Sequence, residues 1–456
     1  MLEDLKKIIG DDSRIVVDEI PDKYLSDTLG RMRGTARALV FPTSTQEAAG
    51  VVRYAWENGL PVTPRGAGTN LVGSTVPHGE GIVLDFSKMN RVLEIDEETF
   101  TATVEPGVVL EDFQRLVESK GLFYPPDPGE KTATIGGNIS TNAGGMRAVK
   151  YGVTRDYVRG LEVVTADGRV INVGSKNVKD ATGLSLKNLI IGSEGTLCVI
   201  TKCILRLVPK PELSRSALVP FGSLKDGITA VHGIIECNAN PTAIEFMERS
   251  VVELGENYIG DYKFPCPEAK AYILLTFDGT EEQVNEGVKR VKTVIGKYNA
   301  LDFIELTDAN ESAAVWRVRG CLVKAVEATS EQEPVDLVVP INRTVEFIKY
   351  VHELEERSGM RMVAFGHAGD GNVHLCIVRG NRSDEEWNTE LKRNMSDLYR
   401  KAYQLGGLTS GEHGIGLGKQ PYFIENTNPT NIELMRSIKD ALDARHILND
   451  HISYLK

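Results

Sequence analysis

Apolar and polar positions alternate along the first third of the chain in a way that predicts short strands joined by amphipathic helices. The apolar run ALVF, residues 38–41, is typical of a strand, and LPVT, residues 60–63, is typical of another. Between them a helical pattern begins at Ser44, with Glu47 in capping-box spacing, and stops at Gly59. A β-α-β unit of this length predicts parallel strands with a right-handed crossover.

The strand and helix pattern continues until prolines interrupt it in the segment PKPE. Residues 161–173, LEVVTADGRVINV, place an Asp-Gly turn between two apolar runs, which is a strong signal for a β-hairpin. A further helical pattern puts Leu110, Phe113 and Val117 on one face. We therefore expect a first, α/β domain over residues 1–211.

The second half of the chain predicts an α+β domain built on an antiparallel sheet. Strand and helix patterns follow one another twice in the order β-α-β, which suits such a sheet with helices on one face. The segments DLVVP and VAFGH…HLCIV are expected to extend the same sheet. This domain is expected over residues 212–415, and the helix in residues 416–456 is expected to pack back on the first domain.

Composition and charge narrow the classes of function. The 456 residues have a net charge of −12 and no basic run, which argues against nucleic acid as a partner. No stretch of about eighteen apolar residues predicts a membrane span, and the N-terminal segment does not resemble a secretory signal. The six cysteines lack CxxC spacing, which argues against an iron-sulfur cluster or a zinc ribbon. We expect a cytoplasmic protein with reduced thiols.

Two glycine-rich segments have the chemistry of a cofactor cradle. In PRGAGTNLVGS, glycines let backbone N–H groups approach an anion, and Thr69 and Asn70 add side-chain donors. The segment is not a Rossmann fingerprint, because the third glycine is missing, and GEHGIGLGKQ fails as a Walker loop. The second segment, PPDPGEKTATIGGNISTNAGGMRAVKYG, is typical of a backbone that packs against something flat or against another backbone. The alternative is a set of tight turns that bind nothing.

Two of the eight histidines flank one turn of a predicted hairpin. In VAFGHAGDGNVHLCIV, residues 363–378, the small residues AGDGN fold the chain back and bring His374 near His367. Two neutral imidazoles a few ångströms apart can bind one cation together, and a carboxylate is the usual third ligand. Glu412, in the glycine-flanked segment TSGEHGIG, offers such a carboxylate, with His413 directly beside it. The alternative is a pair of core histidines without a metal.

Together these segments resemble a known family from about residue 35 to the end of the chain. Four segments resemble the PCMH-type FAD-binding domain of the vanillyl-alcohol-oxidase superfamily: PRGAGTNLVG, PPDPGEKTATIGGNISTNAGG, YGVTRDYVRGLEVV and IGSEGTLCVIT. Four others are similar to the branch that contains D-lactate dehydrogenase, the glycolate oxidase flavoprotein subunit and D-2-hydroxyglutarate dehydrogenase: AIEFM, VWRVR, GHAGDGNVH and SGEHGIG. The resemblance implies an FAD-binding domain followed by a substrate domain.

The resemblance also implies two sets of residues that contact FAD. The set that would hold the pyrophosphate comprises Arg65, Gly66, Ala67, Gly68, Thr69 and Asn70. The set that would line the rest of the cofactor comprises Pro126, Asp127, Thr134, Gly137, Asn138, Asn142, Ala143, Gly144, Gly145, Glu194, Gly195 and Ile200. Relatives that attach flavin covalently through the first loop carry a histidine there. None stands between Pro64 and Ser74, so we expect non-covalent FAD.

Roles for the histidine segments follow from the same resemblance. His367, His374 and Glu412 would be ligands of a divalent cation, which could be Zn²⁺, Fe²⁺ or Mn²⁺. His413 would remove the hydroxyl proton of a chelated 2-hydroxy acid, a role that suits histidine near neutral pH. Hydride transfer from C2 to flavin N5 would then give the 2-oxo acid. Arg319 occupies the position whose family counterpart pairs with the substrate carboxylate.

The resemblance bears on substrate size as well. Family members that act on 2-hydroxyglutarate carry a lysine shortly before the strand that reads PVDLVVP here, whereas this chain has Pro334. One cation fewer favours a small D-2-hydroxy monoacid, D-lactate or glycolate, over a diacid. Two other readings stay open at this stage. One is a flavin-free zinc hydrolase whose glycine segments bind a phosphorylated substrate, and the other is a flavin subunit that only conducts electrons.

A reduced flavin needs an electron acceptor, and the sequence does not specify it. The resemblance names an electron-transfer flavoprotein, an iron-sulfur subunit or a membrane quinone, and oxygen is a further candidate. A soluble protein partner is favoured, because no basic amphipathic membrane helix is present in the sequence. The C-terminal segment LDARHILNDHISYLK departs from the proline-rich end of many relatives at Ala444, Asp450 and His451. We expect this departure to affect which acceptor docks.

Overall fold

The computed structural model describes residues 1–455 and divides into two compact units. Unit 1 comprises residues 1–144, 153–210 and 412–455, and unit 2 comprises residues 145–152 and 211–411. The break after Lys210 falls beside the predicted boundary at residue 211. Two short segments are divided differently from the predicted domains, since residues 145–152 join unit 2 and residues 412–415 join unit 1.

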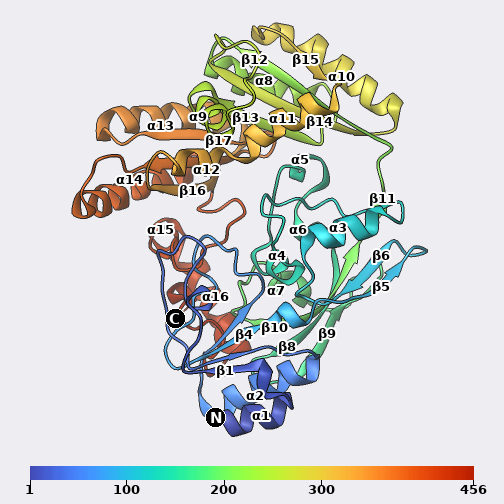
Figure 1. Ribbon diagram of the computed structural model, residues 1–456, viewed down its shortest axis with the longest axis vertical. Helices are drawn as coiled ribbons and strands as arrows, with labels where there is room; N and C mark the ends of the chain where they lie inside the picture. The colour runs from blue at the N-terminus through green and yellow to red at the C-terminus, as the bar shows by residue number, and fades with distance from the viewer. Residues whose placement is uncertain (456) are drawn as a thin grey trace. The chain divides into compact units, whose positions relative to one another are not determined.

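Unit 1 contains a mixed four-stranded sheet beside its first helices (Figure 1). The strand order is β1 (Ile15–Val17), β2 (Ala38–Val40), β4 (Ile82–Asp85) and β3 (Val62–Arg65). Strands β2 and β3 each pair in parallel with β4, while β1 is antiparallel to β2. The predicted β-α-β unit is therefore present with parallel strands, but β4 lies between them.

Helix α2 (Thr45–Asn58) connects β2 and β3 and begins and ends as the sequence predicts. The Ser44 hydroxyl accepts the Glu47 N–H at 3.2 Å, and Gly59 closes the helix at φ 63°. The second half of the capping box does not form. The Glu47 carboxylate instead accepts the Thr43 N–H at 2.7 Å and pairs with Arg14.

A second sheet of unit 1 has five antiparallel strands. Their order is β5 (Val92–Asp96), β6 (Thr101–Val104), β10 (Cys198–Arg206), β8 (Val158–Thr165) and β9 (Val170–Gly174). The predicted hairpin is confirmed as β8 and β9. Helix α3 (Leu110–Glu118) buries Leu110, Phe113 and Val117 as expected, and β7 (Leu122–Phe123) pairs with β11 (Val208–Pro209).

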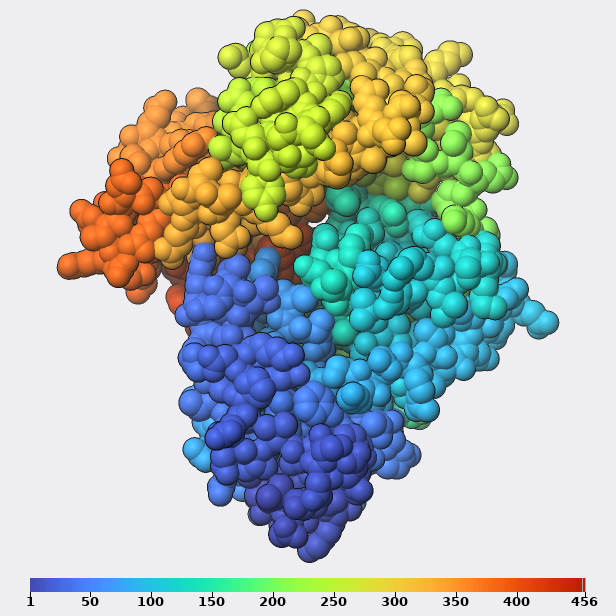
Figure 2. Space-filling view, in the orientation of Figure 1, coloured from blue at the N-terminus to red at the C-terminus, as the bar shows by residue number. Residues whose placement is uncertain are grey.

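Both ends of the chain belong to unit 1. Near the N-terminus, α1 (Leu2–Ile9) buries Leu5 and Ile9 and lies at the surface, where Figure 2 shows it in dark blue. The C-terminal helices are α15 (Gln420–Asn426) and α16 (Pro429–Leu442). The buried Lys439 of α16 pairs with Asp443, and its Nζ also donates to the Thr196 and Leu448 carbonyls, each at 2.7 Å. The returning C-terminal helix is confirmed.

Unit 2 is built on one antiparallel sheet of seven strands. Their order is β15 (Ile304–Leu306), β12 (Leu213–Phe221), β14 (Ala271–Gly279), β13 (Ala243–Glu248), β17 (Met362–His367), β18 (Asn372–Val378) and β16 (Gln332–Val338). The α+β class expected for this half is confirmed, and the predicted histidine hairpin is β17 and β18, which lie between β13 and the edge strand β16.

Helices cover both faces of this sheet, whereas the sequence pattern suggested one face. Tyr272 and Leu274 share a core with α9 (Arg249–Ile259), α11 (Ala309–Gly320) and α12 (Leu322–Glu327). On the opposite face the Phe277 ring lies against α10 (Glu281–Ile295). Helices α8 (Leu224–Glu236), α13 (Thr344–Ser358) and α14 (Asp384–Gln404) complete the unit. Periodicity predicts that a helix packs on a sheet, but it does not say on which face.

The segment 145–152 contains the short helix α5 (Ala148–Tyr151), which is held to unit 2 by polar and apolar contacts. Lys150 pairs with the buried Asp278 and also donates to its backbone carbonyl at 2.7 Å. The Tyr151 hydroxyl donates to the same carboxylate at 3.0 Å.

None of the helices in residues 1–455 combines the length and the apolar composition that a membrane span requires.

Candidate functional site

The hairpin of β17 and β18 brings the two predicted metal-ligating histidines together. In the strand register Phe365 lies opposite His374 and His367 lies opposite Asn372. The two imidazole rings have centroids 5.0 Å apart and are perpendicular. His367 is 7% exposed and His374 is partly buried. A turn of small residues therefore returns the second imidazole to the first, as the sequence predicts.

A buried carboxylate that the sequence analysis did not identify orients His367. Glu245, on the neighbouring strand β13, is fully buried, and its Oε1 lies 2.7 Å from His367 Nδ1. This bond leaves Nε2 as the natural ligand atom, which is the usual arrangement of a carboxylate behind a metal-binding histidine. Burial raises the pKa of the Glu245 carboxyl, but the adjacent His367 and Arg319 outweigh that effect and hold it below its usual range.

Arg319, the predicted partner of the substrate carboxylate, has Glu245 as a partner of its own. Its Nε and Nη2 lie 2.9 and 2.6 Å from Glu245 Oε2, and the guanidinium also lies over the Phe365 ring at 5.2 Å. Nη1 is not used in this ion pair. The arrangement forms a chain from Arg319 through Glu245 to His367, in which each charge is compensated inside a buried site.

A second buried carboxylate supports the loop that leads to the predicted third ligand. Asp336, on β16, accepts the Asn372 amide at 2.8 Å, the Ser410 hydroxyl at 2.7 Å and the Gly411 N–H at 3.2 Å. Asn372 is the residue opposite His367 in the hairpin. One carboxylate therefore fastens residues 410 and 411 to the histidine hairpin.

Glu412 follows Gly411 by one peptide bond, so the loop held by Asp336 sets where it begins. His367 and His374 belong to unit 2, whereas Glu412 begins the last segment of unit 1. His413 Nε2 lies 3.7 Å from Glu412 Oε1. Two imidazoles and a carboxylate are a donor set that suits a divalent transition metal or zinc.

The predicted pyrophosphate loop, residues 65–74, follows β3 in unit 1. Arg65 is buried, and its Nη2 donates to the Lys23 carbonyl at 2.5 Å, so the guanidinium braces its own loop. Burial lowers the pKa of Arg65, although the Asp85 carboxylate opposes the shift. Gly68 has φ 74°, and a methyl group there would lie 2.0 Å from the Arg65 guanidinium. Only glycine fits this position without displacing Arg65.

The second glycine segment contains the short helix α4 (Ile135–Thr141), which packs closely within unit 1, since a Cβ at Gly136 would lie 2.5 Å from Pro106. The Thr134 hydroxyl accepts the Gly137 N–H at 3.3 Å, and a Cβ at Gly66 would lie 2.2 Å from it. Asn138 is 4% exposed, and its Nδ2 has no hydrogen-bond partner in the described structure. A buried amide without a partner between glycine loops fits a cofactor that would accept this hydrogen bond.

The remaining predicted cofactor residues lie in several parts of the fold. Those in unit 1 are Ala67, Thr69, Asn70, Pro126, Asp127, Asn142, Ala143, Gly144, Glu194, Gly195 and Ile200, whereas Gly145 begins the segment that joins unit 2. Asn142 ends α4 at φ 53°, and its Oδ1 accepts the Arg155 N–H at 2.9 Å. Asp127 pairs with Lys131. Several of these side chains are thus already bonded within the protein.

Glu245, Asp336 and Asn449 are the residues that sequence reasoning missed. Glu245 stands between apolar residues in the segment AIEFM and Asp336 stands between apolar residues in PVDLVVP, and an acid at such a position in a buried strand signals a specific partner. Asn449 donates to the Glu194 and Ser74 carbonyls at 2.7 and 3.1 Å. It lies in the C-terminal segment, beside the altered position Asp450.

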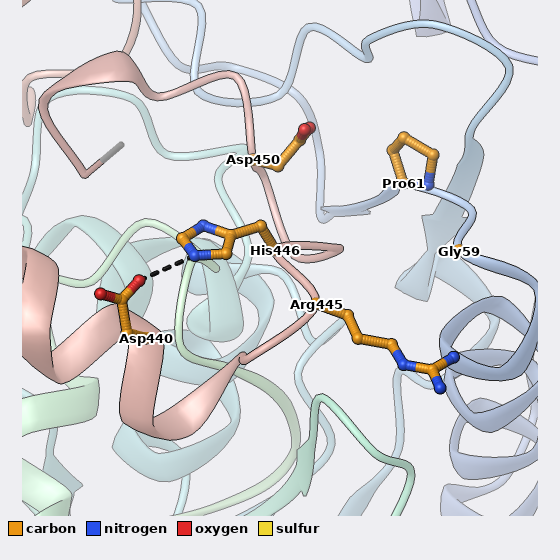
Figure 3. A pocket seen from close by; sticks show the side chains of 6 residues that line it. All are labelled: Gly59, Pro61, Asp440, Arg445, His446 and Asp450. Carbon is orange, nitrogen blue, oxygen red and sulfur yellow. Dashed lines mark hydrogen bonds and ion pairs between the residues drawn. The ribbon is translucent and has the colours of Figure 1, made fainter.

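A separate pocket of about 500 Å³ in unit 1 is not the site of this chemistry. Figure 3 shows its lining, which comprises Gly59, Pro61, Asp440, Arg445, His446 and Asp450. His446 Nε2 lies 2.8 Å from Asp440 Oδ1, and Arg445 Nη1 donates to the Trp56 carbonyl at 2.5 Å. The lining includes none of the residues predicted to hold FAD, a cation or substrate.

Two family models match the chain and together cover most of it. The model described as "FAD binding domain" matches residues 36–174, and that described as "FAD linked oxidases, C-terminal domain" matches residues 210–451. The first match covers the glycine segments of unit 1. The second contains the histidine hairpin, Glu245 and the segment with Glu412 and His413.

Curated relatives match over almost the full length. The chain is 41% identical to a D-lactate dehydrogenase of Anaerostipes hadrus, over 98% of this chain and 96% of the relative. It is 38% identical to glycolate oxidase subunit GlcD of Bacillus subtilis (strain 168), over 93% of this chain and 90% of the relative. A solved structure of p-cresol methylhydroxylase with substrate bound has a TM-score of 0.81, with 98% and 95% of the two chains covered. At 18% identity that likeness concerns the fold alone.

Proposed function

Since the chain belongs to the family of FAD-linked oxidases and is an FAD-linked oxidoreductase, we propose that it oxidises a small D-2-hydroxy acid to the 2-oxo acid. The substrate class is that of its relatives, D-lactate or glycolate. The observation that carries the proposal is the pair of perpendicular imidazoles of His367 and His374, with Glu245 behind His367, in a chain that also has the FAD-binding fold. A flavin-free hydrolase is no longer favoured, because the FAD-binding domain accounts for both glycine segments.

His367, His374 and Glu412 would hold a divalent cation, with His367 presenting Nε2 because Nδ1 faces Glu245. The cation would supply a positive charge for the carboxylate and hydroxyl of the substrate, and bound FAD would supply the hydride acceptor. Zn²⁺, Fe²⁺ and Mn²⁺ all suit two imidazoles and one carboxylate. Glu245 and Arg319 neutralise each other's charge. The same Glu245 carboxylate faces His367 Nδ1 and so keeps the imidazole in one orientation.

His413 is the residue proposed to take the hydroxyl proton. Glu412 is assigned as a ligand and cannot easily also serve as the base, whereas the adjacent His413 has an imidazole 3.7 Å from that carboxylate. Arg319 would use its Nη1 edge for the substrate carboxylate while Nε and Nη2 stay on Glu245. The proton and the carboxylate of the substrate are thus handled by two different side chains of this chain.

The glycine segments would bind FAD without a covalent bond. Asn138 Nδ2 and the N–H groups of the loop 65–74 are the donors that a dinucleotide would use. No histidine stands in that loop to attach the flavin. Acid precipitation should therefore release all the FAD into the supernatant.

Substrate size is proposed from β16, the strand beside the histidine hairpin. Pro334 occupies the position where relatives that act on 2-hydroxyglutarate have a lysine, and it lies opposite Cys376 in the strand pair. Neither side chain carries a positive charge that a second carboxylate could bind. A monoacid is therefore favoured over the alternative, a diacid such as D-2-hydroxyglutarate.

The electrons are proposed to leave through a soluble protein acceptor in the cytoplasm, such as an electron-transfer flavoprotein or an iron-sulfur subunit. The six cysteines lack the spacing of a cluster motif, so we expect the electrons to pass to a separate acceptor. Nucleic acid is not expected as a partner of a chain with net charge −12.

The test is anaerobic mixing of the FAD-loaded protein with D- and L-lactate, glycolate and D-2-hydroxyglutarate, together with metal analysis of the same sample. Bleaching of the flavin by D-lactate or glycolate, but not by L-lactate, is expected with about one cation per chain. A flavin that none of these acids reduces would refute the proposed oxidation and leave a subunit that only conducts electrons. Faster reduction by the diacid would refute the assignment of substrate size.

A further inference from the structure

We propose that Glu194 is a positioning residue that fastens the loop bearing His413 to the cofactor loop, residues 65–74. The inference rests on the proposed function, because it gives His413 the role of base. The resemblance placed Glu194 among the residues that line FAD. Its carboxylate, however, is bonded on both oxygens to the protein itself, which indicates a different task.

The bonds of Glu194 reach both loops. Oε1 accepts the Ile415 N–H at 2.8 Å, and Oε2 accepts the Gly416 N–H at 2.8 Å. Oε2 also accepts the hydroxyl of Ser74, at the end of the cofactor loop. Glu194 is 5% exposed, so three donors surround a carboxylate that is almost withdrawn from water. The residue thus joins Ser74 on one side to the two residues after Gly414 on the other.

Asn70 makes a second connection between the same two loops. Its Nδ2 donates to the His413 carbonyl at 3.1 Å, while its Oδ1 accepts the N–H groups of Val72 and Ser74, each at 3.0 Å. The Val72 carbonyl in turn accepts the N–H of Leu417 at 2.7 Å. His413 is therefore carried on a short segment that is bonded at its own carbonyl and at residues 415–417.

Two of the three glycines in the segment GEHGIG, Gly414 and Gly416, are explained by this contact. Gly414 has φ 85°, and a Cβ there would lie 2.8 Å from the Glu194 carboxyl carbon. Gly416 has φ 46°, and a Cβ there would lie 2.2 Å from the Val72 carbonyl oxygen. Both positions need glycine because the cofactor loop and Glu194 press directly against the backbone. The glycine pattern that resembled a nucleotide loop serves loop-to-loop packing here.

A direct role of the Glu194 carboxylate in FAD binding is less compatible with these contacts. A buried carboxylate would repel the pyrophosphate, and its oxygens already accept three hydrogen bonds. Burial raises the pKa of Glu194, but the Ser74 hydroxyl and the two backbone N–H groups oppose the shift. The geometry is that of a side chain that holds two backbone segments together by hydrogen bonds.

The test compares wild type with Glu194→Gln, in which one oxygen becomes an NH₂ group that cannot accept a backbone N–H. Hydrogen exchange of the Ile415 and Gly416 amides should be slow in wild type and should accelerate at least about tenfold in the variant. The FAD dissociation constant should change less than about threefold. The first-order rate of flavin reduction by the acid that reduces wild type should fall about ten- to a hundredfold, with little change in substrate affinity, because the base is displaced. The pH profile of this rate should shift as well.

Two further variants keep the result interpretable. Glu105→Gln removes an equally buried glutamate that pairs with Arg91, and it should change none of these readouts. Glu194→Asp keeps the charge but shortens the side chain, and it should give the same changes to a smaller extent, which covers the case in which the glutamine variant does not fold.

Three results would overturn the proposal. These are unprotected Ile415 and Gly416 amides in wild type, a large loss of FAD affinity with a normal reduction rate in the variant, or no change of any readout. If wild type itself is not reduced by any 2-hydroxy acid, the proposed function fails. The amide exchange of the variant still decides whether Glu194 holds the loop.

Discussion

The histidine hairpin of unit 2 and the cofactor loops of unit 1 are built in opposite ways. In the hairpin, side chains are proposed to provide the chemistry, and buried carboxylates hold them, as Glu245 holds His367. In the cofactor loops, the polar side chains mostly bond to the protein, as Asn70 and Glu194 do, so backbone groups are proposed to contact FAD. A charge deletion should therefore be most damaging in unit 2, and an added methyl group most damaging in unit 1.

The first prediction removes a ligand from the hairpin and has the largest expected effect. His374→Ala should lose the cation, because two remaining ligands bind a divalent ion poorly. Loss of a positive charge that contributes several kcal/mol should slow flavin reduction on the order of a thousandfold. Metal analysis and anaerobic stopped-flow absorbance measure the two losses. His413→Ala is the matched variant, expected to keep both FAD and metal while reduction falls about 10²- to 10⁴-fold.

These two variants test the division of roles between ligand and base. Metal loss in His413→Ala would show that His413 is a ligand rather than the base. Full metal occupancy and normal reduction in His374→Ala would remove His374 from the cation site. Either result would contradict the description of the hairpin as a site whose side chains provide the chemistry.

The second prediction concerns the carboxylate behind His367. Glu245→Gln keeps the shape of the side chain but removes the charge that faces His367 and Arg319. Carboxylates that hydrogen-bond to a metal-binding histidine typically contribute about 10- to 100-fold to metal affinity or activity. We expect Glu245→Gln to lose about that much in metal affinity and in activity. Titration of the metal-free protein with Zn²⁺ and Mn²⁺ measures the affinity.

Glu256→Gln is a close control for this change. Glu256 is also fully buried in unit 2 and also pairs with an arginine, Arg249, but it has no histidine partner. We expect Glu256→Gln to lower the melting temperature without changing metal affinity. Equal metal affinity in Glu245→Gln and wild type would mean that Glu245 only supports the fold.

The third prediction adds a methyl group to the cofactor loop. Gly68→Ala forces φ 74° on a residue with a Cβ and brings that atom to 2.0 Å from Arg65. We expect the free loop to relax from this conformation, so restoring it on FAD binding costs about 1–2 kcal/mol, which corresponds to roughly tenfold weaker binding. Fluorescence of released FAD measures the dissociation constant. Gly59→Ala has a similar φ of 63° but open space around its Cβ, so it should leave FAD affinity unchanged.

The strands, the hairpin turns and the closeness of His374 to His367 could be predicted because they depend on local pattern. Residues AGDGN close a turn, and the turn alone brings His374 back to His367. The supports of the site could not be predicted, since they come from other strands. Glu245 reaches His367 only because β13 and β17 are neighbours in the sheet, and that order is not encoded in either segment.

In unit 1 the predicted cofactor residues were chosen by resemblance, which does not say where each side chain points. The sequence indicates glycine-rich loops, but it does not reveal that Glu194 bonds to residues 415 and 416, more than two hundred positions later. The division at residues 145–152 was missed for the same reason. A lysine in that segment pairs with Asp278, which lies in a strand of unit 2.

The fourth prediction, with the smallest effect, uses a second imidazole–carboxylate pair in unit 2. His352 Nε2 lies 3.2 Å from Glu248 Oε1, and hydrogen bonds to Glu248 and then Glu355 raise the pKa of His352 to about 10. Because the pKa is raised on folding, this stabilisation is complete below the unfolded value of about 6.5 and is lost as the pH rises towards 10.

His352→Gln should therefore lower the melting temperature of the protein at pH 6 by no more than about 3 °C, since the pair is partly exposed to water. The difference from wild type should shrink at pH 10, where the wild-type histidine loses its charge. Thermal unfolding followed by circular dichroism at both pH values measures it. A difference that is equal at both values would mean that His352 stabilises unit 2 by packing. A carboxylate partner is common to His352 and His367, so the contrast between the two histidines would then rest on burial and on the proposed cation.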